Sequence, residues 1–189
     1  LAAKGKMQFG AQFGLDGALV TGPISLATLP DWITLGGLEA GTLEISLDVK
    51  GQGKDWRTWQ TTGWVALTNG LVIDKRLDGP VKDLYLRLKL VRNGAELKRL
   101  TFRVNDTDAS LSGVIRNLHT KPTITMRVES SQLDIDLLIP KGVRSPLREM
   151  LETLAESTKL VATVSVDRGM YKQFLFSNLS CRVNIGDGV

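Results

Sequence analysis

The sequence predicts a mostly-β fold in which consecutive strands pair antiparallel as a meander. Apolar and polar residues alternate along most of the 189-residue chain, and this period of two is typical of strands with one apolar and one polar face. Gly, Asn, Asp or Pro closes each alternating stretch. Only one segment shows the spacing of an amphipathic helix. With 42% hydrophobic and 23% charged residues, the composition is that of a folded globular chain.

The predicted strands follow one another along the whole chain. Alternation is clearest in segment 84–90, where leucines are separated by Tyr85, Arg87 and Lys89. The short sequences RNGAE (92–96) and NDTDA (105–109) predict hairpin turns between neighbouring strands. The alternating stretches span residues 6–17, 18–29, 41–51, 62–73, 81–94, 95–106, 109–118, 121–140, 160–166 and 171–188.

Segment 145–157 breaks this pattern and predicts one amphipathic helix. Its apolar positions 147, 150, 151, 154 and 155 recur at helical spacing after the start signal Ser145-Pro146. The polar side of this helix is net acidic, which favours packing on the sheet over contact with an anionic membrane surface.

Two carboxylates, Asp134 and Asp136, stand in the otherwise aliphatic stretch ESSQLDIDLLIP (129–140). If the strand continues through this stretch, Leu133, Ile135 and Leu137 share one face and the two aspartates share the solvated face. A carboxylate pair for glycoside hydrolysis would also need an apolar pocket around one acid, which no neighbouring segment supplies. We therefore expect no catalytic pair here.

Other chemical motifs are absent from the sequence. No phosphate loop, dinucleotide-binding glycine pattern or nucleophile elbow occurs. The single Cys181 excludes an internal disulfide and cannot build a zinc site with the single His119, which lies in a polar turn. Cys181 alternates with apolar residues and is expected to be a small core residue. The sequence predicts a protein that is not an enzyme and uses no metal or cofactor.

The charge distribution does not indicate nucleic-acid binding. The formal net charge is only +4, and the basic residues are spread along the chain, whereas nucleic-acid binding requires a clustered basic surface. The densest basic patch, ELKRLTFR (96–103), is expected to be a solvated edge strand that deters edge-to-edge pairing. No apolar run approaches the length of a membrane-spanning helix.

The number of predicted strands raises the question of what covers their apolar faces. One helix is too little to cover so many strands. A second sheet could pack on the first in a closed sandwich or barrel, or a curved sheet could hold an apolar ligand on its concave apolar face. The alternation itself leaves both solutions open.

The order of signals in residues 108–140 resembles the C-terminal region of the AsmA-like family of bacterial envelope proteins, the AsmA, TamB and YhdP group. A strand ending in Ser-Gly is followed by a short linker with proline, a strand ending in serine, and then the sequence LDIDLLIP (133–140). Upstream, GWVALTNGLVI (63–73) and LDGPVKDLYLRLKL (77–90) are similar to further elements of that family. The resemblance covers about residues 40–189, departs from the family at WRTWQ (56–60), and includes no membrane helix.

This resemblance implies a U-shaped, β-taco-like sheet with an apolar groove, in a periplasmic segment of a protein anchored in the inner membrane. Residues 1–189 would form a single segment of a longer, repetitive groove protein, cut at both ends, with the helix interrupting its strands. The implied function is binding and conduction of phospholipid acyl chains between the inner and outer membranes during envelope biogenesis. The residues expected to line the groove are Leu43, Ile45, Leu47, Val65, Leu67, Leu84, Leu86, Leu88, Leu90, Leu111, Ile115, Ile124, Met126, Val128, Leu133, Ile135 and Leu137.

The alternative hypothesis is a closed β-sandwich that acts as a scaffold. In that case the same leucines form an ordinary core, and the protein assists outer-membrane assembly through protein partners. An open groove would instead present a contiguous apolar surface larger than soluble monomers usually show. The isolated segment would then dimerise or capture lipid to cover it.

Overall fold

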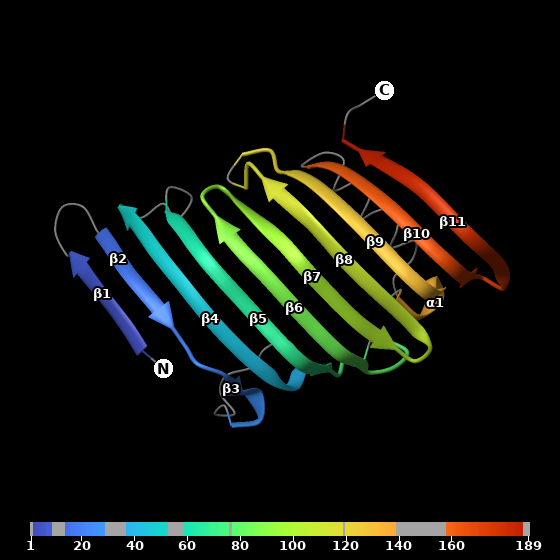
Figure 1. The fold of residues 1–189 in the computed structure, drawn as a ribbon, viewed down its shortest axis with the longest axis horizontal. Helices are drawn as coiled ribbons and strands as arrows, with labels where there is room; N and C mark the ends of the chain where they lie inside the picture. The colour runs from blue at the N-terminus through green and yellow to red at the C-terminus, as the bar shows by residue number, and fades with distance from the viewer. Residues whose placement is uncertain are drawn as a thin grey trace.

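The computed structural model describes residues 2–8, 14–28, 37–52, 59–75, 77–118, 120–138 and 158–186. Their strands form one large mixed sheet of 11 strands, which follow chain order across the sheet, with β3 paired to β4 beside this path (Figure 1). The strands are β1 (Ala2–Gln8), β2 (Gly14–Val20), β3 (Ile24–Ser25), β4 (Leu38–Gln52), β5 (Gln60–Val72), β6 (Val81–Val91), β7 (Gly94–Val104), β8 (Thr107–Arg116), β9 (Thr123–Asp134), β10 (Lys159–Tyr171) and β11 (Phe174–Ile185).

The mostly-β prediction is confirmed, and neighbouring strands up to β9 pair antiparallel as expected. The exception is β9 and β10, which run parallel from the pair Thr123 and Lys159 to the pair Asp134 and Met170. The prediction of antiparallel pairing is wrong at this point. Parallel neighbours require the chain to return to the same end of the sheet between the end of one strand and the start of the next. Side chains alternate in the same way in both kinds of pair, so the sequence pattern could not reveal the difference.

The sheet is open. β1 and β11 lie at its opposite edges and do not meet (Figure 1). The described strands therefore form neither the closed sandwich nor the barrel that the sequence left open as an alternative.

Short turns with left-handed residues join the central strands. Val91 pairs with Gly94 across a turn in which Asn93 has φ 59°, and Val104 pairs with Thr107 across a turn in which Asn105 has φ 50°. Asparagine tolerates positive φ better than most residues, which is why it recurs at these turns. The two hairpins predicted at 92–96 and 105–109 are confirmed.

The N-terminal strands differ in their bounds from the predicted ones. The stretch 6–17 is divided between β1 and β2, which pair with each other so that Gly5 lies opposite Gly17. The stretch 18–29 contains the end of β2, the short β3 and a 3₁₀ turn at Leu26–Thr28. Alternation indicated extended chain in these stretches but not where each strand begins.

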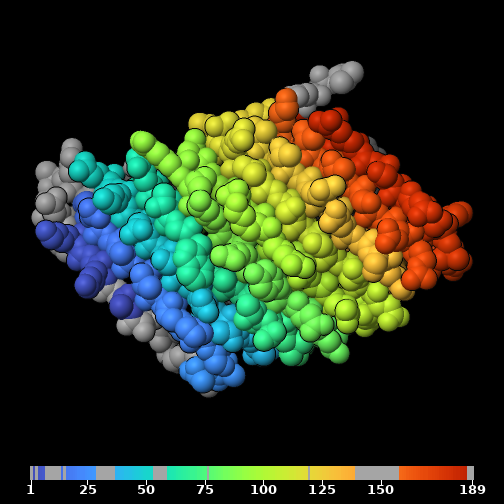
Figure 2. All heavy atoms as spheres, in the orientation of Figure 1, coloured from blue at the N-terminus to red at the C-terminus, as the bar shows by residue number. Residues whose placement is uncertain are grey.

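The sheet buries little of its apolar surface. The chain exposes 13024 Å², whereas a compact monomer of this mass exposes about 8,900 Å². A space-filling view down the shortest axis shows the strands as bands in chain order that reach the surface side by side (Figure 2). Among the described residues, the buried apolar side chains are Leu26, Leu67, Ala95, Val104, Ala109, Ala162 and Val166.

The predicted helix 145–157 lies outside the described residues, as does His119. The described α-helix, α1 (Ile135–Leu138), has 4 residues. None of the helices in the described ranges has the length and apolar character needed to cross a membrane.

Candidate functional site

The candidate site is one face of the sheet, on which apolar residues of successive strands lie directly opposite one another. Because paired residues in a sheet point to the same face, the register shows which side chains share that face. One row across the sheet consists of Leu43, Leu67, Leu86, Leu100, Leu111, Val128, Val164 and Cys181. The next row consists of Ile45, Val65, Leu88, Leu97, Gly113, Met126, Ala162 and Val183. A third consists of Leu47, Gly63, Leu90, Ala95, Ile115, Ile124, Leu160 and Ile185. We call this the apolar face.

The opposite face of the central strands is polar. Arg87 of β6 pairs with Arg99 of β7, and Arg99 lies 6.0 Å from the centre of the Tyr85 ring. On the same face Lys98 Nζ lies 2.6 Å from Glu96 Oε1. The hydrogen bond from Lys98 lowers the pKa of Glu96, helped by the positive charges of Lys98 and Lys89, and together they outweigh the opposing effect of desolvation. The sheet is therefore amphipathic across its thickness.

The sequence predicted that the basic patch 96–103 forms an edge strand, and this prediction is wrong. The patch belongs to β7, which lies between β6 and β8 in the middle of the sheet. Its charges are directed to the polar face, where Arg103 Nη1 also lies 3.8 Å from Asp83 Oδ2. Alternation shows which face a residue occupies, but only the pairing order shows whether a strand is central.

The apolar face is only partly covered. Leu67 is 5% exposed and Val166 is 1% exposed, but most leucines of the rows are half-buried, and Leu179 and Leu175 on β11 are 38% and 82% exposed. A soluble monomer rarely shows contiguous apolar surface of this extent without a ligand or partner.

The residues predicted to line a groove fall into two groups. The strand register places all the predicted residues from Leu43 to Val128 on the apolar face. Leu84, which pairs with Gly70, lies at the margin of this face. The remaining ones, Leu133, Ile135 and Leu137, do not continue these rows. Alternation along β9 places Leu133 on the face opposite to Val128, and the strand ends at Asp134.

The strand ends here because the two aspartates form local hydrogen bonds. The main-chain amide of Asp136 donates to Asp134 Oδ1 over 3.0 Å, so Asp134 caps the N-terminus of α1. Asp136 Oδ2 accepts a hydrogen bond of 2.6 Å from the amide of Lys172, in the turn between β10 and β11. The prediction that both aspartates lie on the solvated face of a continuing strand is therefore wrong, and both have structural roles. Asp134 before a helical turn is an N-cap signal, but the alternating pattern masked it.

Sequence reasoning missed a large part of the apolar face. β7, β10 and β11 contribute residues that were not among the predicted lining. Leu97 and Leu100 are separated by a bulge that interrupts the alternation, and the β10 residues join the face only because β10 lies beside β9. The missed members with apolar side chains are Ala95, Leu97, Leu100, Leu160, Ala162, Val164, Val183 and Ile185.

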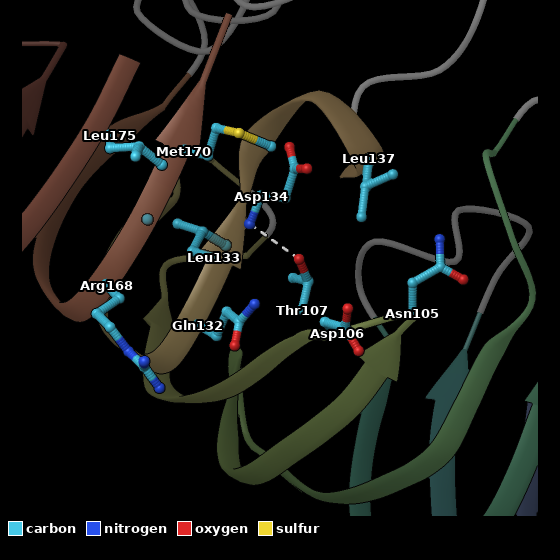
Figure 3. A pocket seen from close by; sticks show the side chains of 11 residues that line it. Asn105, Asp106, Thr107, Gln132, Leu133, Asp134, Leu137, Arg168, Met170 and Leu175 are labelled. Carbon is cyan, nitrogen blue, oxygen red and sulfur yellow. Dashed lines mark hydrogen bonds between the residues drawn. The ribbon is translucent and has the colours of Figure 1, made fainter. Parts of the chain in front are cut away.

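A hollow of about 460 Å³ lies where the apolar face meets the turn between β7 and β8. Figure 3 shows its side chains: Asn105 and Asp106 of the turn on one side, Met170 and Leu175 of β10 and β11 on the other. Between them, the amide of Asp134 donates a hydrogen bond of 2.8 Å to Thr107 Oγ1. The lining residues are Asn105, Asp106, Thr107, Gln132, Leu133, Asp134, Leu137, Arg168, Gly169, Met170 and Leu175.

Asp108 connects β8 to β9 near this hollow. Its Oδ1 accepts hydrogen bonds from the Ser131 hydroxyl (2.7 Å) and from the amides of Gln132 (2.9 Å) and Ser131 (3.1 Å). Partial burial raises the pKa of Asp108, but these hydrogen bonds to Ser131 and Gln132 outweigh it, so the pKa lies below its ordinary value.

The structure tests the prediction that Cys181 is a core residue. Cys181 is exposed on the edge strand β11, so the expectation of a core cysteine is wrong. Its neighbours are apolar, as the alternation showed, but β11 is the last strand of the described sheet and has no described strand on its outer side. Within the described ranges, no group of three or more His, Cys, Asp or Glu side chains could hold a metal ion.

The chain matches no protein-family model, no curated protein sequence and no solved structure.

Proposed function

We propose that this chain is a lipid-binding, lipid-conducting segment of an AsmA-like envelope protein, in which acyl chains lie against the apolar face. The observation that carries this proposal is the set of rows of apolar side chains that run from β4 to β11 on a single open sheet, with glycine in place of a side chain at Gly63 and Gly113. The resemblance of residues 40–189 to the AsmA-like family supports it.

Energetics favour an apolar ligand on such a face. Burial of each methylene group stabilises a complex by about 0.8 kcal/mol. This contribution has no preferred direction, so an acyl chain can move along the rows without breaking oriented contacts. In the proposed functional form the sheet curves into a U, the apolar face is its concave side, and phospholipid passes along it through the periplasm between the inner and outer membranes.

A scaffolding role is the second candidate, and one observation favours it. β11 is an edge strand with a single charged residue, Arg182, and its Phe174 is 77% exposed. Uncharged, exposed edge strands readily pair with a strand of another chain. Protein partners in the envelope would then add strands to this edge.

Two neighbouring substitutions in β6 test the lipid proposal. Leu88 pairs with Val65 and Leu97 on the apolar face, whereas Lys89 pairs with Trp64 and Glu96 on the polar face. We expect Leu88→Asp to reduce captured phospholipid at least about tenfold, because each methylene that loses its apolar contact costs binding free energy. Lys89→Asp places the same charge one residue away and should leave lipid capture unchanged.

The measurement is native mass spectrometry of the purified chain, combined with extraction and identification of bound lipid. Circular dichroism checks that both variants remain folded. A folded, lipid-free monomer that also does not bind added phospholipid would refute the lipid proposal and favour the scaffolding role.

A further inference from the structure

The apolar face ends in polar residues at one end of β8, β9 and β10. By alternation, the same face of β9 carries Val128, then Ser130, Gln132 and Asp134 toward the end of the strand. The other two strands change in the same direction, and the residues that follow their apolar stretches are Thr107 on β8 and Arg168 on β10. A ligand lying along these strands would meet apolar side chains along most of its length and polar ones at this end.

The hollow of about 460 Å³ lies at this polar end. Sites for small ligands have volumes of about 300–1,000 Å³, so it has room for a small polar group and the atoms next to it. Its lining includes Thr107, Gln132, Asp134 and Arg168, all from the face that carries the apolar rows (Figure 3). Leu137, Met170 and Leu175 supply apolar contacts in the same hollow.

Resting on the lipid-binding function proposed above, we propose that this hollow binds the headgroup of a zwitterionic phospholipid with a primary ammonium, a phosphoethanolamine group, while the acyl chains follow the apolar rows away from it.

The charges of the lining favour a zwitterion. Arg168 supplies one positive charge, and Asp106 and Asp134 supply two negative charges. A guanidinium binds phosphate oxygens through paired hydrogen bonds, and Arg168 is exposed and forms no salt bridge with another described residue. The two carboxylates would attract a cationic group and repel a headgroup whose net charge is negative.

The side chains also distinguish between two kinds of ammonium. Quaternary ammonium groups are held by aromatic rings, and the described residues of the lining include none. A primary ammonium has three donors, which carboxylate and amide oxygens can accept. Asp106, Asn105 and Gln132 provide such oxygens, and Asp134 keeps acceptor capacity beyond its hydrogen bond to the Asp136 amide.

Three phospholipids with identical short acyl chains test the proposal: phosphatidylethanolamine, phosphatidylcholine and phosphatidylglycerol. Native mass spectrometry of the purified chain, with each lipid below its micelle concentration, gives the three dissociation constants. We expect phosphatidylethanolamine to bind at least about tenfold more tightly than the other two, the size of effect that one charge-assisted hydrogen bond can supply.

The substitutions Arg168→Gln and Asp106→Asn should each remove most of this preference while the acyl-chain contribution remains. Arg182→Gln is the matched control, because Arg182 lies on β11 opposite Thr163, on the polar face. Circular dichroism checks that each variant is folded. Because Arg168→Gln and Asp106→Asn are separate variants, the proposal can still be tested if one of them does not fold.

Each outcome bears on the proposal. Equal binding of all three lipids, or tightest binding of phosphatidylglycerol, would overturn the headgroup site and leave the lipid-binding function intact. Binding of none would overturn both. Soluble glycerophosphoethanolamine serves as the arm without acyl chains, and if it binds as tightly as the lipid, the hollow is a site for a free phosphate ester instead.

Discussion

The amide of Asp134 donates a hydrogen bond of 2.8 Å to the hydroxyl of Thr107, joining the end of β9 to the start of β8. Thr107 is 1% exposed, so the acceptor is shielded from water. The main-chain register between β8 and β9 ends at Ser110 and Glu129, so this bond joins the two strands beyond their paired residues. It fixes the point at which the chain leaves the sheet and enters α1.

Replacing Thr107 by valine should lower the free energy of unfolding by about 1–3 kcal/mol, because it leaves a poorly solvated amide without its partner. Urea denaturation measures this change. Thr107→Ser keeps the acceptor and should lose less, so equal losses in the two variants would contradict a role for the hydroxyl.

Substitutions of Asp134 should distinguish a helix cap from a solvated strand residue. Asp134→Ala should cost about 0.5–2 kcal/mol of stability, whereas Asp134→Asn should be nearly neutral because asparagine is an equally good N-cap. Thermal or urea unfolding gives both values. A neutral Asp134→Ala would mean that the cap does not stabilise the fold.

Asp108 predicts a loss of stability in acid. Its pKa in the folded state lies below the ordinary value of 3.8, so the folded state binds fewer protons than the unfolded state near that pH. The stabilisation is fully present above pH 3.8 and is lost as the pH falls from there through the folded-state pKa.

Asp108→Ala should therefore lower stability by about 1–2 kcal/mol at neutral pH, where three solvent-accessible hydrogen bonds to a carboxylate are lost, and flatten the acid-dependent part of the stability curve. Urea midpoints measured from pH 6 down to pH 3 test this. If the urea midpoint of Asp108→Ala falls with pH as steeply as that of the unsubstituted protein, other carboxylates, such as Glu96, cause the loss of stability in acid.

Two phenylalanines of β11 form a matched pair for testing the edge. Phe174 is 77% exposed at the edge, whereas the ring of Phe176 lies over Gly169 of β10. Phe174→Lys should reduce self-association without loss of stability, because a lysine on an edge strand disfavours pairing with another chain. Phe176→Lys should destabilise the β10 and β11 pair instead. Sedimentation velocity and urea unfolding separate the two effects, and self-association that persists in Phe174→Lys would exclude this edge as its cause.

Cys181 should react with a maleimide in the native state at a rate close to that of the unfolded chain, because it is exposed on the edge strand. A core cysteine would react only after unfolding, so protection by a factor of about a hundred or more in native buffer would contradict this placement. Saturation with phospholipid offers a further comparison, since Cys181 ends one of the apolar rows.

Several properties of the protein follow from its sequence alone. Alternation at Leu84, Leu86, Leu88 and Leu90 determined a strand with one apolar face, and Asn93 and Asn105 determined the turns beside β7. These signals are local: the period of two follows from the geometry of an extended chain, and the turns depend on the backbone preferences of single residues.

Only the tertiary structure decided which strands are neighbours, and with them the extent of the apolar face. The parallel pairing of β9 and β10 adds Val164 and Ala162 to that face, and the open edge leaves Cys181 exposed. The end of β9 at Asp134 depends on Thr107, which is 27 residues away in the sequence. Contacts between residues far apart in the chain determine each of these features, and an alternating pattern is the same whether a strand is central or at an edge, and whether its neighbour runs parallel or antiparallel.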